Sequence, residues 1–461
     1  MARLYFQRNA ASYWMLGVLC LAQVLLQGCD KFFDVRPDTS VVNPTTLKDF
    51  QEMLNNDSLA LCNFMLADFT SDDLRLEDAH VSAAPASSYT QAWLWGASVW
   101  RPGEDDFMYN TAYSRILQMN IILDRVGRTA GKESDKELVK AQALINRAWY
   151  YLQLANSYGA DYRAPVAATD LAVPLILAPD ATVMPVRATV KAVYDRVLED
   201  LQAAVASPSL PGMGQDVLHP GKAAGLALLA RAYLYMGRYT EAQQAAEASL
   251  AIHSQLHKYT QDFAAPTSLL DLSRNPEVLL ARMCIDYTFF GIRFTGFFID
   301  PGLKALLGDN DLRRTAHFSG DQYAVGNMTN SMTCDYSVGV AEVMLIRAEC
   351  LARKNDGAGA MEIVNTVRKN RLAQYSPLDG GTNVLKTVLE ERRRELFYRG
   401  GLRLFDLKRL NRDNAFAQTV QRTKDDGITV QASLVPNSPR YLLPFSPVII
   451  ANNPAIIQNP R

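Results

Sequence analysis

Three tryptophans lie close together in a stretch of the sequence that has few helix signals. Trp93, Trp95 and Trp100 fall within eight residues, and three acidic residues follow at 104–106. Indole rings can cover the apolar face of a sugar ring, while carboxylates, amides and guanidinium groups bond its hydroxyl groups. The pattern predicts a sugar-binding platform. For any single tryptophan, packing in the core is about equally expected, since tryptophan is highly buried on average.

One polar loop and one aromatic stretch complete the predicted ligand site. Asp72, Asp73 and Arg75 fall in a polar loop that we expect beside the tryptophans, and Tyr287 lies in a stretch rich in phenylalanine. The predicted ligand-binding residues are Asp72, Asp73, Arg75, Trp93, Trp95, Trp100 and Tyr287. Adjacent acids could also serve glycoside cleavage, but adjacency in sequence does not set the spatial gap that this reaction needs. Solvated loop acids are the favoured interpretation.

Common catalytic and cofactor-binding motifs are absent from the sequence. It contains no GxSxG, HExxH, P-loop or GxGxxG. His253 and His257 are four residues apart on an expected helix, a spacing that can hold a metal, but no third ligand follows nearby. The net charge of −1 and the lack of a long basic run argue against nucleic-acid binding. We expect no catalytic residue, metal, cofactor or nucleic-acid partner.

The N-terminus has the order of a lipoprotein signal peptide. Two arginines precede an apolar stretch that ends at Gly28-Cys29. The small glycine lets a peptidase approach the bond, and the Cys29 thiol would carry the lipid. The apolar run is too short to span a bilayer core of ~30 Å. We predict that residues 1–28 are removed and that Cys29 anchors the chain to a membrane. This interpretation is favoured over the alternative that the apolar stretch is a buried N-terminal helix.

Four further cysteines follow the predicted lipid-bearing residue. They are Cys62, Cys284, Cys334 and Cys350. None has CxxC spacing, so a zinc site is not expected. The spacing leaves open whether they form one or two disulfides or stay free and buried.

Most of the chain has the apolar periodicity of amphipathic helices. The spacing predicts helices over residues 107–127, 136–158, 190–206 and 222–236. At 232–242 the sequence fits the turn of a tetratricopeptide unit, with Gly237 at a left-handed helix end. Looser pairs involve residues 148–158 with the helix before them, and residues 341–371. We predict an all-α fold with about four tetratricopeptide-like helix pairs and few short strands.

Two stretches interrupt the helical pattern and suggest how the chain is divided. Residues 160–186 are punctuated by proline, and residues 256–338 mix aromatics, glycines and short apolar runs. Long ordered loops on a rigid scaffold usually carry binding function. We predict a signal peptide at 1–28, a helical region with the helix pairs at 29–255, a loop-rich insert at 256–338 and a C-terminal region at 339–461.

A dense run of charge lies near the C-terminal third of the chain, at residues 390–395 with the sequence EERRRE. Such a run is usually a solvated helix face or an ion-pair network. Glu390 and Arg394 are four residues apart and can pair, which at a surface would contribute under ~1 kcal/mol.

This charge run opens the clearest family motif in the sequence. Residues 389–409, LEERRRELFYRGGLRLFDLKR, resemble the SusD/RagB family pattern of an E-R-R-x-E-L helix, a glycine and then R-x-x-D-L-x-R. The tail at 441–460 resembles the family's I-P-x-x-E and N-P…Q-N-P ending, with departures at Phe445 and Ser446. Residues 113–122 and 311–314 resemble its Y-x-x-I-x-x-x-N-x-I-L helix and D-x-R turn. The resemblance spans nearly the whole chain.

The resemblance implies a helical lipoprotein on the outside of the outer membrane. Family members bind oligosaccharides, or peptides in some cases, and pass them to a SusC-like, TonB-dependent transporter over which they form a lid. They are not enzymes, and their binding residues vary, so no motif assigns those residues here. Two alternatives stay open: a cell-envelope glycoside hydrolase that uses paired acids, and a tetratricopeptide scaffold for envelope assembly.

Overall fold

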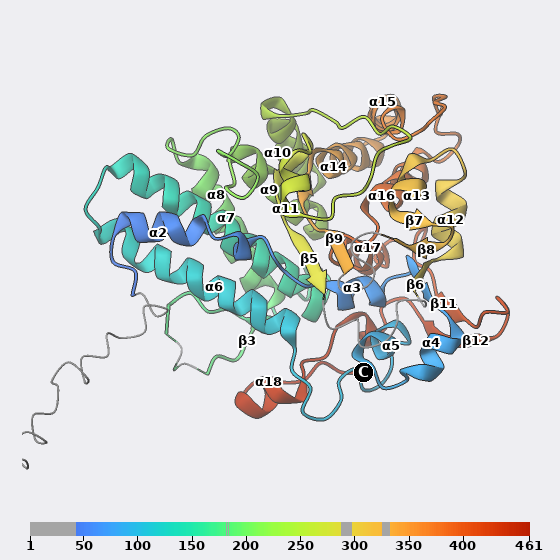
Figure 1. Cartoon of the computed structure of the whole chain (residues 1–461), viewed down its shortest axis with the longest axis horizontal. Coiled ribbons are helices and arrows are strands. Elements are labelled where there is room, and N and C mark those ends of the chain that lie inside the picture. Colours follow the sequence, from blue (N-terminus) through green and yellow to red (C-terminus); the bar gives the residue numbers. More distant parts are fainter. Residues whose placement is uncertain (1–42, 181, 183, 287–296, 325–331) are drawn as a thin grey trace, which may run out of the picture. The chain divides into compact units, whose positions relative to one another are not determined.

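A series of helices that pack on one another in chain order forms the scaffold of the protein (Figure 1). In this computed structural model, residues 43–461 are described except 181, 183, 287–296 and 325–331, and residues 46–461 form one compact unit. The scaffold helices are α6 (Phe107–Arg125), α7 (Glu133–Tyr158), α8 (Val190–Ala206), α9 (Lys222–Met236), α10 (Tyr239–Ile252), α14 (Val340–Arg353) and α15 (Gly357–Lys369). The expected helices are confirmed to within three residues at each end. The fold is all-α and tetratricopeptide-like, as predicted.

The turn between α9 and α10 shows how the sequence builds these helix pairs. Gly237 has φ of 75°, and its N–H donates to Leu234 O while Arg238 N–H donates to Tyr233 O, which closes the end of α9. Small buried side chains then let the two helices approach closely. Ala242 and Ala246 are buried on α10, and the Ser249 hydroxyl donates to the Ala223 carbonyl of α9 at 2.8 Å.

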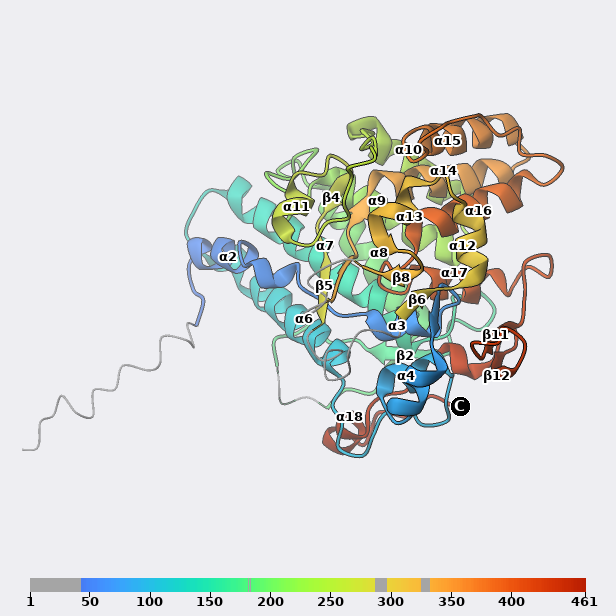
Figure 2. The same cartoon turned by 45° about the vertical axis from the view of Figure 1, so that its right-hand side comes forward.

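The other α-helices have at most thirteen residues, and most of them lie together beside this scaffold (Figures 1 and 2). They are α2 (Leu47–Leu54), α3 (Met65–Thr70), α4 (Asp78–Ala83), α5 (Ser88–Trp93), α11 (Leu269–Ser273), α12 (Pro301–Leu307), α13 (Leu312–His317), α16 (Val384–Leu396), α17 (Leu402–Leu410) and α18 (Pro447–Asn452). Because α10 ends at Ile252, His253 and His257 do not share a helix, and the expectation that they do is wrong. No helix in the described part of the chain has the length and apolar character needed to cross a bilayer.

Short antiparallel strands complete the fold, and one strand of the predicted insert pairs with the strand at residues 74–76. The pairs are β2 (Leu171–Pro174) with β3 (Arg187–Thr189), β4 (Val278–Leu280) with β10 (Val338–Gly339), β5 (Met283–Asp286) with β9 (Met332–Asp335), and β11 (Val420–Thr423) with β12 (Val430–Leu434). A four-stranded sheet has the order β1 (Leu74–Leu76), β6 (Phe297–Ile299), β8 (Gln322–Tyr323) and β7 (Phe318–Ser319). Residues 256–338 therefore share one compact unit with the helices on both sides.

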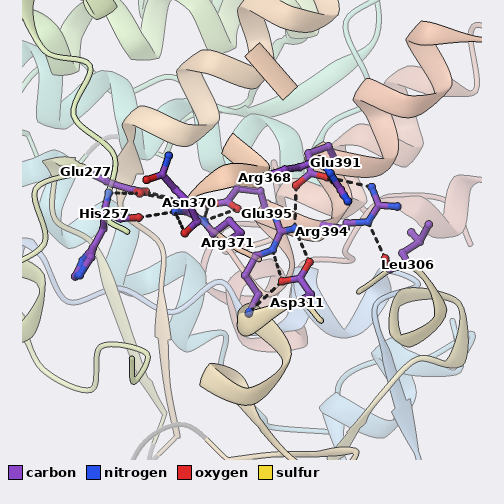
Figure 3. A network of polar contacts seen from close by, with 11 residues as sticks. His257, Glu277, Leu306, Asp311, Arg368, Asn370, Arg371, Glu391, Arg394 and Glu395 are labelled. Carbon is purple, nitrogen blue, oxygen red and sulfur yellow. Dashed lines mark hydrogen bonds and ion pairs between the residues drawn. The ribbon is translucent and has the colours of Figure 1, made fainter. Parts of the chain in front are cut away.

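The charge run at 390–395 forms part of a buried ion-pair network rather than a solvated face (Figure 3). Glu391 lies within 2.8 Å of Arg313 and 3.0 Å of Arg368, and Glu395 lies within 2.7 Å of both Arg313 and Arg371. Arg371 also reaches Glu277 at 2.7 Å. The network joins α13, α15, α16 and the segment before β4, so it fixes the insert to the C-terminal region.

Candidate functional site

The three tryptophans of the predicted platform lie in the interior of the protein. Trp93, Trp95 and Trp100 are 1%, 0% and 8% exposed. Their indole N–H groups donate to the carbonyls of Leu74, Thr70 and Pro444 at 3.1, 2.9 and 2.7 Å. The rings of Trp93 and Trp95 are also covered by a guanidinium group, that of Arg422.

These positions correct the prediction of an exposed tryptophan platform. Rings that are enclosed in this way present no face on which a sugar could stack. Trp100 borders a small cavity of about 150 Å³, which it shares with residues near the C-terminus. Because their indole N–H groups bond main-chain carbonyls, the three tryptophans stabilise the surrounding backbone from the interior of the protein.

The two adjacent acids of the predicted site are held by arginines of the family motif. Arg403 approaches Asp72 with two nitrogens at 2.6 and 2.7 Å, and Arg393 lies 2.8 Å from Asp73. Burial raises the pKa of Asp72, but the charges of Arg393 and Arg403 outweigh burial and hold it below its usual range. For Asp73, burial and the nearby Asp72 raise the pKa to about 6. Both carboxylates are thus part of the internal structure, and their assignment to ligand binding is corrected.

The other predicted site residues do not assemble with the tryptophans either. Arg75 pairs with Asp425 and lies over the ring of Phe298, 5.1 Å from its centroid. Tyr287 and Cys29 lie outside the described residues. Cys62, Cys284, Cys334 and Cys350 are all buried, and these four thiols form no disulfide with one another.

A groove along α6 is the best candidate for a ligand site among the described residues. It has a volume of about 480 Å³ and is lined by Leu61, Cys62, Phe107, Asn110, Thr111, Ser114 and Arg115. Five of these residues recur at helical spacing, so they lie on one face of α6. The Phe107 side chain is 63% exposed at the start of the helix, which is unusual for so large an apolar group. An exposed ring next to amide, hydroxyl and guanidinium groups can hold a sugar.

The start of α6 is fixed firmly, which positions Phe107 and Asn110. The Asp106 side chain caps the helix by accepting from Tyr109 N–H at 3.0 Å, and it also accepts from the hydroxyl of Tyr158 on α7. Asn110 donates to Asp105 at 2.7 Å. On the opposite wall, Cys62 N–H donates to Met283 O of β5 at 3.0 Å. Both walls of the groove are therefore held by hydrogen bonds to the scaffold.

Positive charge gathers at the base of the groove. The Arg115 side chain is partly buried, and its Nε has no hydrogen-bond partner. Arg282 lies buried nearby, with its guanidinium 4.9 Å from the ring centroid of Trp149. Burial raises the pKa of the Cys62 thiol to about 12, against the opposing charges of Arg282 and Arg115. The thiol is thus neutral near pH 7, and the Arg115 guanidinium, which lines the groove, supplies its positive charge.

Two family models match most of the chain between them. A family model described as "Starch-binding associating with outer membrane" matches residues 31–234, and a model of the SusD family matches residues 316–461. This chain belongs to the SusD/RagB family. As a SusD/RagB protein it belongs to a group associated with the outer membrane. None of the curated proteins matches the chain.

Solved structures share the fold of this SusD/RagB chain at low sequence identity. A SusD superfamily protein from Bacteroides thetaiotaomicron is 21% identical, with 90% of this chain and 100% of that chain covered and a TM-score of 0.70. A SusD-like carbohydrate binding protein from Bacteroides vulgatus is 20% identical, with coverage of 90% and 98% and a TM-score of 0.68. Surface glycan-binding protein A from Bacteroides fluxus is 18% identical, with coverage of 90% and 100% and a TM-score of 0.67.

Sequence reasoning placed α6 correctly but missed the groove residues on it. Phe107, Asn110, Ser114 and Arg115 lie within the expected helix at 107–127. The buried face of this helix is already formed by other apolar residues. An additional aromatic residue at its start, Phe107, is therefore a signal for an exposed ring that could bind a ligand. Nothing local indicates that Leu61 and Cys62 form the opposite wall.

Proposed function

We propose that this protein is a surface lipoprotein that binds oligosaccharides in the α6 groove without cleaving them. It then delivers them to a SusC-like, TonB-dependent transporter. The observation that carries the proposal is the exposed Phe107 ring beside Asn110, Ser114 and Arg115 in one groove. Family membership supports the same role, and relatives of the same fold carry the printed names of glycan-binding and carbohydrate-binding proteins.

The arrangement of the groove explains how a sugar chain would be held. The Phe107 ring would pack against the apolar face of one sugar unit. Asn110 and Ser114 would bond hydroxyl groups one and two helical turns further along, and the Arg115 guanidinium would donate to an oxygen of the ligand. No carboxylate is among the described residues that line the groove, so these residues do not supply the two positioned acids that glycoside hydrolysis uses in most families.

A glycan array and a peptide library, probed with the mature chain, test the ligand class. We expect oligosaccharides to bind and peptides not to bind. A hydrolysis assay on the bound glycans is expected to show no turnover, and steady product release would support the hydrolase alternative instead. Recovery of envelope-assembly factors rather than a transporter barrel from solubilised membranes would support the scaffold alternative.

Replacing Cys29 with alanine is expected to remove the membrane anchor. More than one acyl chain is needed for stable attachment, since each buried methylene contributes only ~0.8 kcal/mol. We expect the wild type to fractionate with outer membranes and to carry an acylated N-terminal Cys29, detected by mass spectrometry. Cys29→Ala should lose both properties, whereas the neighbouring change Ser40→Ala should keep both. Outer-membrane association of the Cys29→Ala protein would contradict the lipoprotein assignment.

A further inference from the structure

The α6 groove contains a guanidinium group whose charge is not balanced by a contacting acid. Arg115 lines the groove and is partly exposed, so a ligand can reach it. Arg101, just before α6, pairs with Glu104 at 3.2 Å. Arg128, just after α6, pairs with Asp124 at 2.9 Å. Arg115, by contrast, forms no ion pair with any acid of the described residues.

A second guanidinium group without an acidic partner lies behind the wall of the groove. Arg282 is completely buried and donates to Ala281 O at 2.8 Å and to Asn146 Oδ1, both of which are uncharged. The next residue, Met283, accepts at its carbonyl from Cys62 N–H of the groove wall at 3.0 Å. An uncompensated charge in the interior is costly, so a nearby anion would stabilise this arrangement.

A buried tyrosine of α7 connects the two cations. The Tyr150 hydroxyl donates to Leu59 O at 2.9 Å and accepts from Arg115. The Arg282 guanidinium lies 5.7 Å from the centroid of the Tyr150 ring. Burial raises the pKa of the Cys62 thiol, and the charges of Arg282 and Arg115 oppose this rise. Both positive charges therefore act on the same wall of the groove.

This distribution of charge favours an anionic ligand group over a neutral one at Arg115. A guanidinium presents several N–H donors in one plane and can hold a carboxylate or a sulfate with two hydrogen bonds. Such charge-assisted bonds are roughly twice as strong as bonds between neutral groups. A sugar hydroxyl at the same place would accept a hydrogen bond from Arg115 but would leave both cations without a counter-charge.

We propose that the α6 groove takes an acidic oligosaccharide, whose carboxylate or sulfate group binds Arg115. A neighbouring sugar ring of the same chain packs on Phe107. The two contacts are eight residues apart on α6, roughly 12 Å along the helix axis, so they fall on different sugar units. The inference rests on the proposed function for the groove and for the sugar nature of the ligand, and it adds the charge of that ligand.

Two pairs of ligands that differ chiefly in charge test the proposal on the wild type by calorimetry. One pair is an oligogalacturonate and its methyl ester, and the other is a sulfated galactan oligosaccharide and its desulfated form. We expect at least one acidic member to bind about tenfold more tightly than its neutral partner, and the pair that shows this distinguishes carboxylate from sulfate. The preference should shrink between roughly 20 and roughly 500 mM NaCl, because salt screens partly exposed charges.

Two arginine variants locate the charge that the ligand contacts. Arg115→Gln removes the positive charge from the groove, and Arg128→Gln removes one from the exposed surface after α6. Arg115→Gln should lose most of the preference for the acidic member, whereas Arg128→Gln should keep it. Thermal unfolding checks the fold of both variants, and the comparison of matched ligands on the wild type needs neither of them.

The proposal is overturned if neither acidic member binds more tightly than its neutral partner. It is also overturned if folded Arg115→Gln keeps the full preference, since the charge would then be recognised elsewhere. In both cases, glycan binding that Phe107→Ala weakens would leave the proposed function in place. If no glycan binds, whether acidic or neutral, the proposed function fails and this inference fails with it.

Discussion

Glu395→Ala is expected to destabilise the protein by about 3–5 kcal/mol, the usual range for breaking a buried ion pair by removing one partner. Four buried or partly buried arginines and four acids balance one another in this network, namely Arg313, Arg368, Arg371, Arg394, Glu277, Asp311, Glu391 and Glu395. Removing Glu395 leaves one excess positive charge in the interior. It also takes a carboxylate partner from both Arg313 and Arg371.

Denaturant unfolding followed by circular dichroism measures this change. The control is Asp195→Ala, which breaks an exposed pair with Lys191 on α8 and should change the free energy of unfolding by less than about 1 kcal/mol. Equal, small effects of the two substitutions would show that the network contributes no more than a surface pair does.

Trp95→Ala is expected to lower the free energy of unfolding by about 3–5 kcal/mol, as large-to-small changes of fully buried aromatic residues do. The indole is completely buried, donates to Thr70 O and lies under the Arg422 guanidinium, 4.4 Å from the ring centroid. The backbone at Trp95 has φ of 51°, a conformation that its surroundings must maintain. The variant leaves a cavity and an uncovered buried cation.

The matched control for Trp95→Ala is Phe107→Ala, which truncates an exposed aromatic residue. Its effect on the free energy of unfolding should stay within about 0.5 kcal/mol. If Trp95→Ala kept full stability but lost glycan binding, Trp95 would be a ligand contact after all. The tryptophan platform would then stand.

The helical scaffold could be predicted from the sequence because its signals are local. Apolar periodicity located α6, α7, α8 and α9, and Gly237 marked the turn after α9. The burial of the tryptophans could not be predicted in this way, since the group that covers Trp95 is Arg422, more than 300 positions along the chain. The same holds for Asp72, whose partner Arg403 belongs to the C-terminal motif.

Whether the charged residues at 390–395 are solvated or buried in ion pairs also depends on residues far away in the sequence. The sequence EERRRE is compatible with a solvated helix face or with an ion-pair network. Arg313 and Arg371 decide between the two, because they bring guanidinium groups from α13 and from the segment after α15 to Glu391 and Glu395. The groove was missed for a related reason, since its second wall comes from Leu61 and Cys62.

Equilibrium binding of an array-selected oligosaccharide to three proteins tests the central claim most directly. The proteins are the wild type, Phe107→Ala in the groove, and Leu117→Ala, which truncates a partly exposed residue of α6 outside the groove. We predict that Phe107→Ala weakens binding about tenfold, from the loss of roughly 1.4 kcal/mol of ring contact, and that Leu117→Ala binds like the wild type. Wild-type affinity in Phe107→Ala would contradict the account.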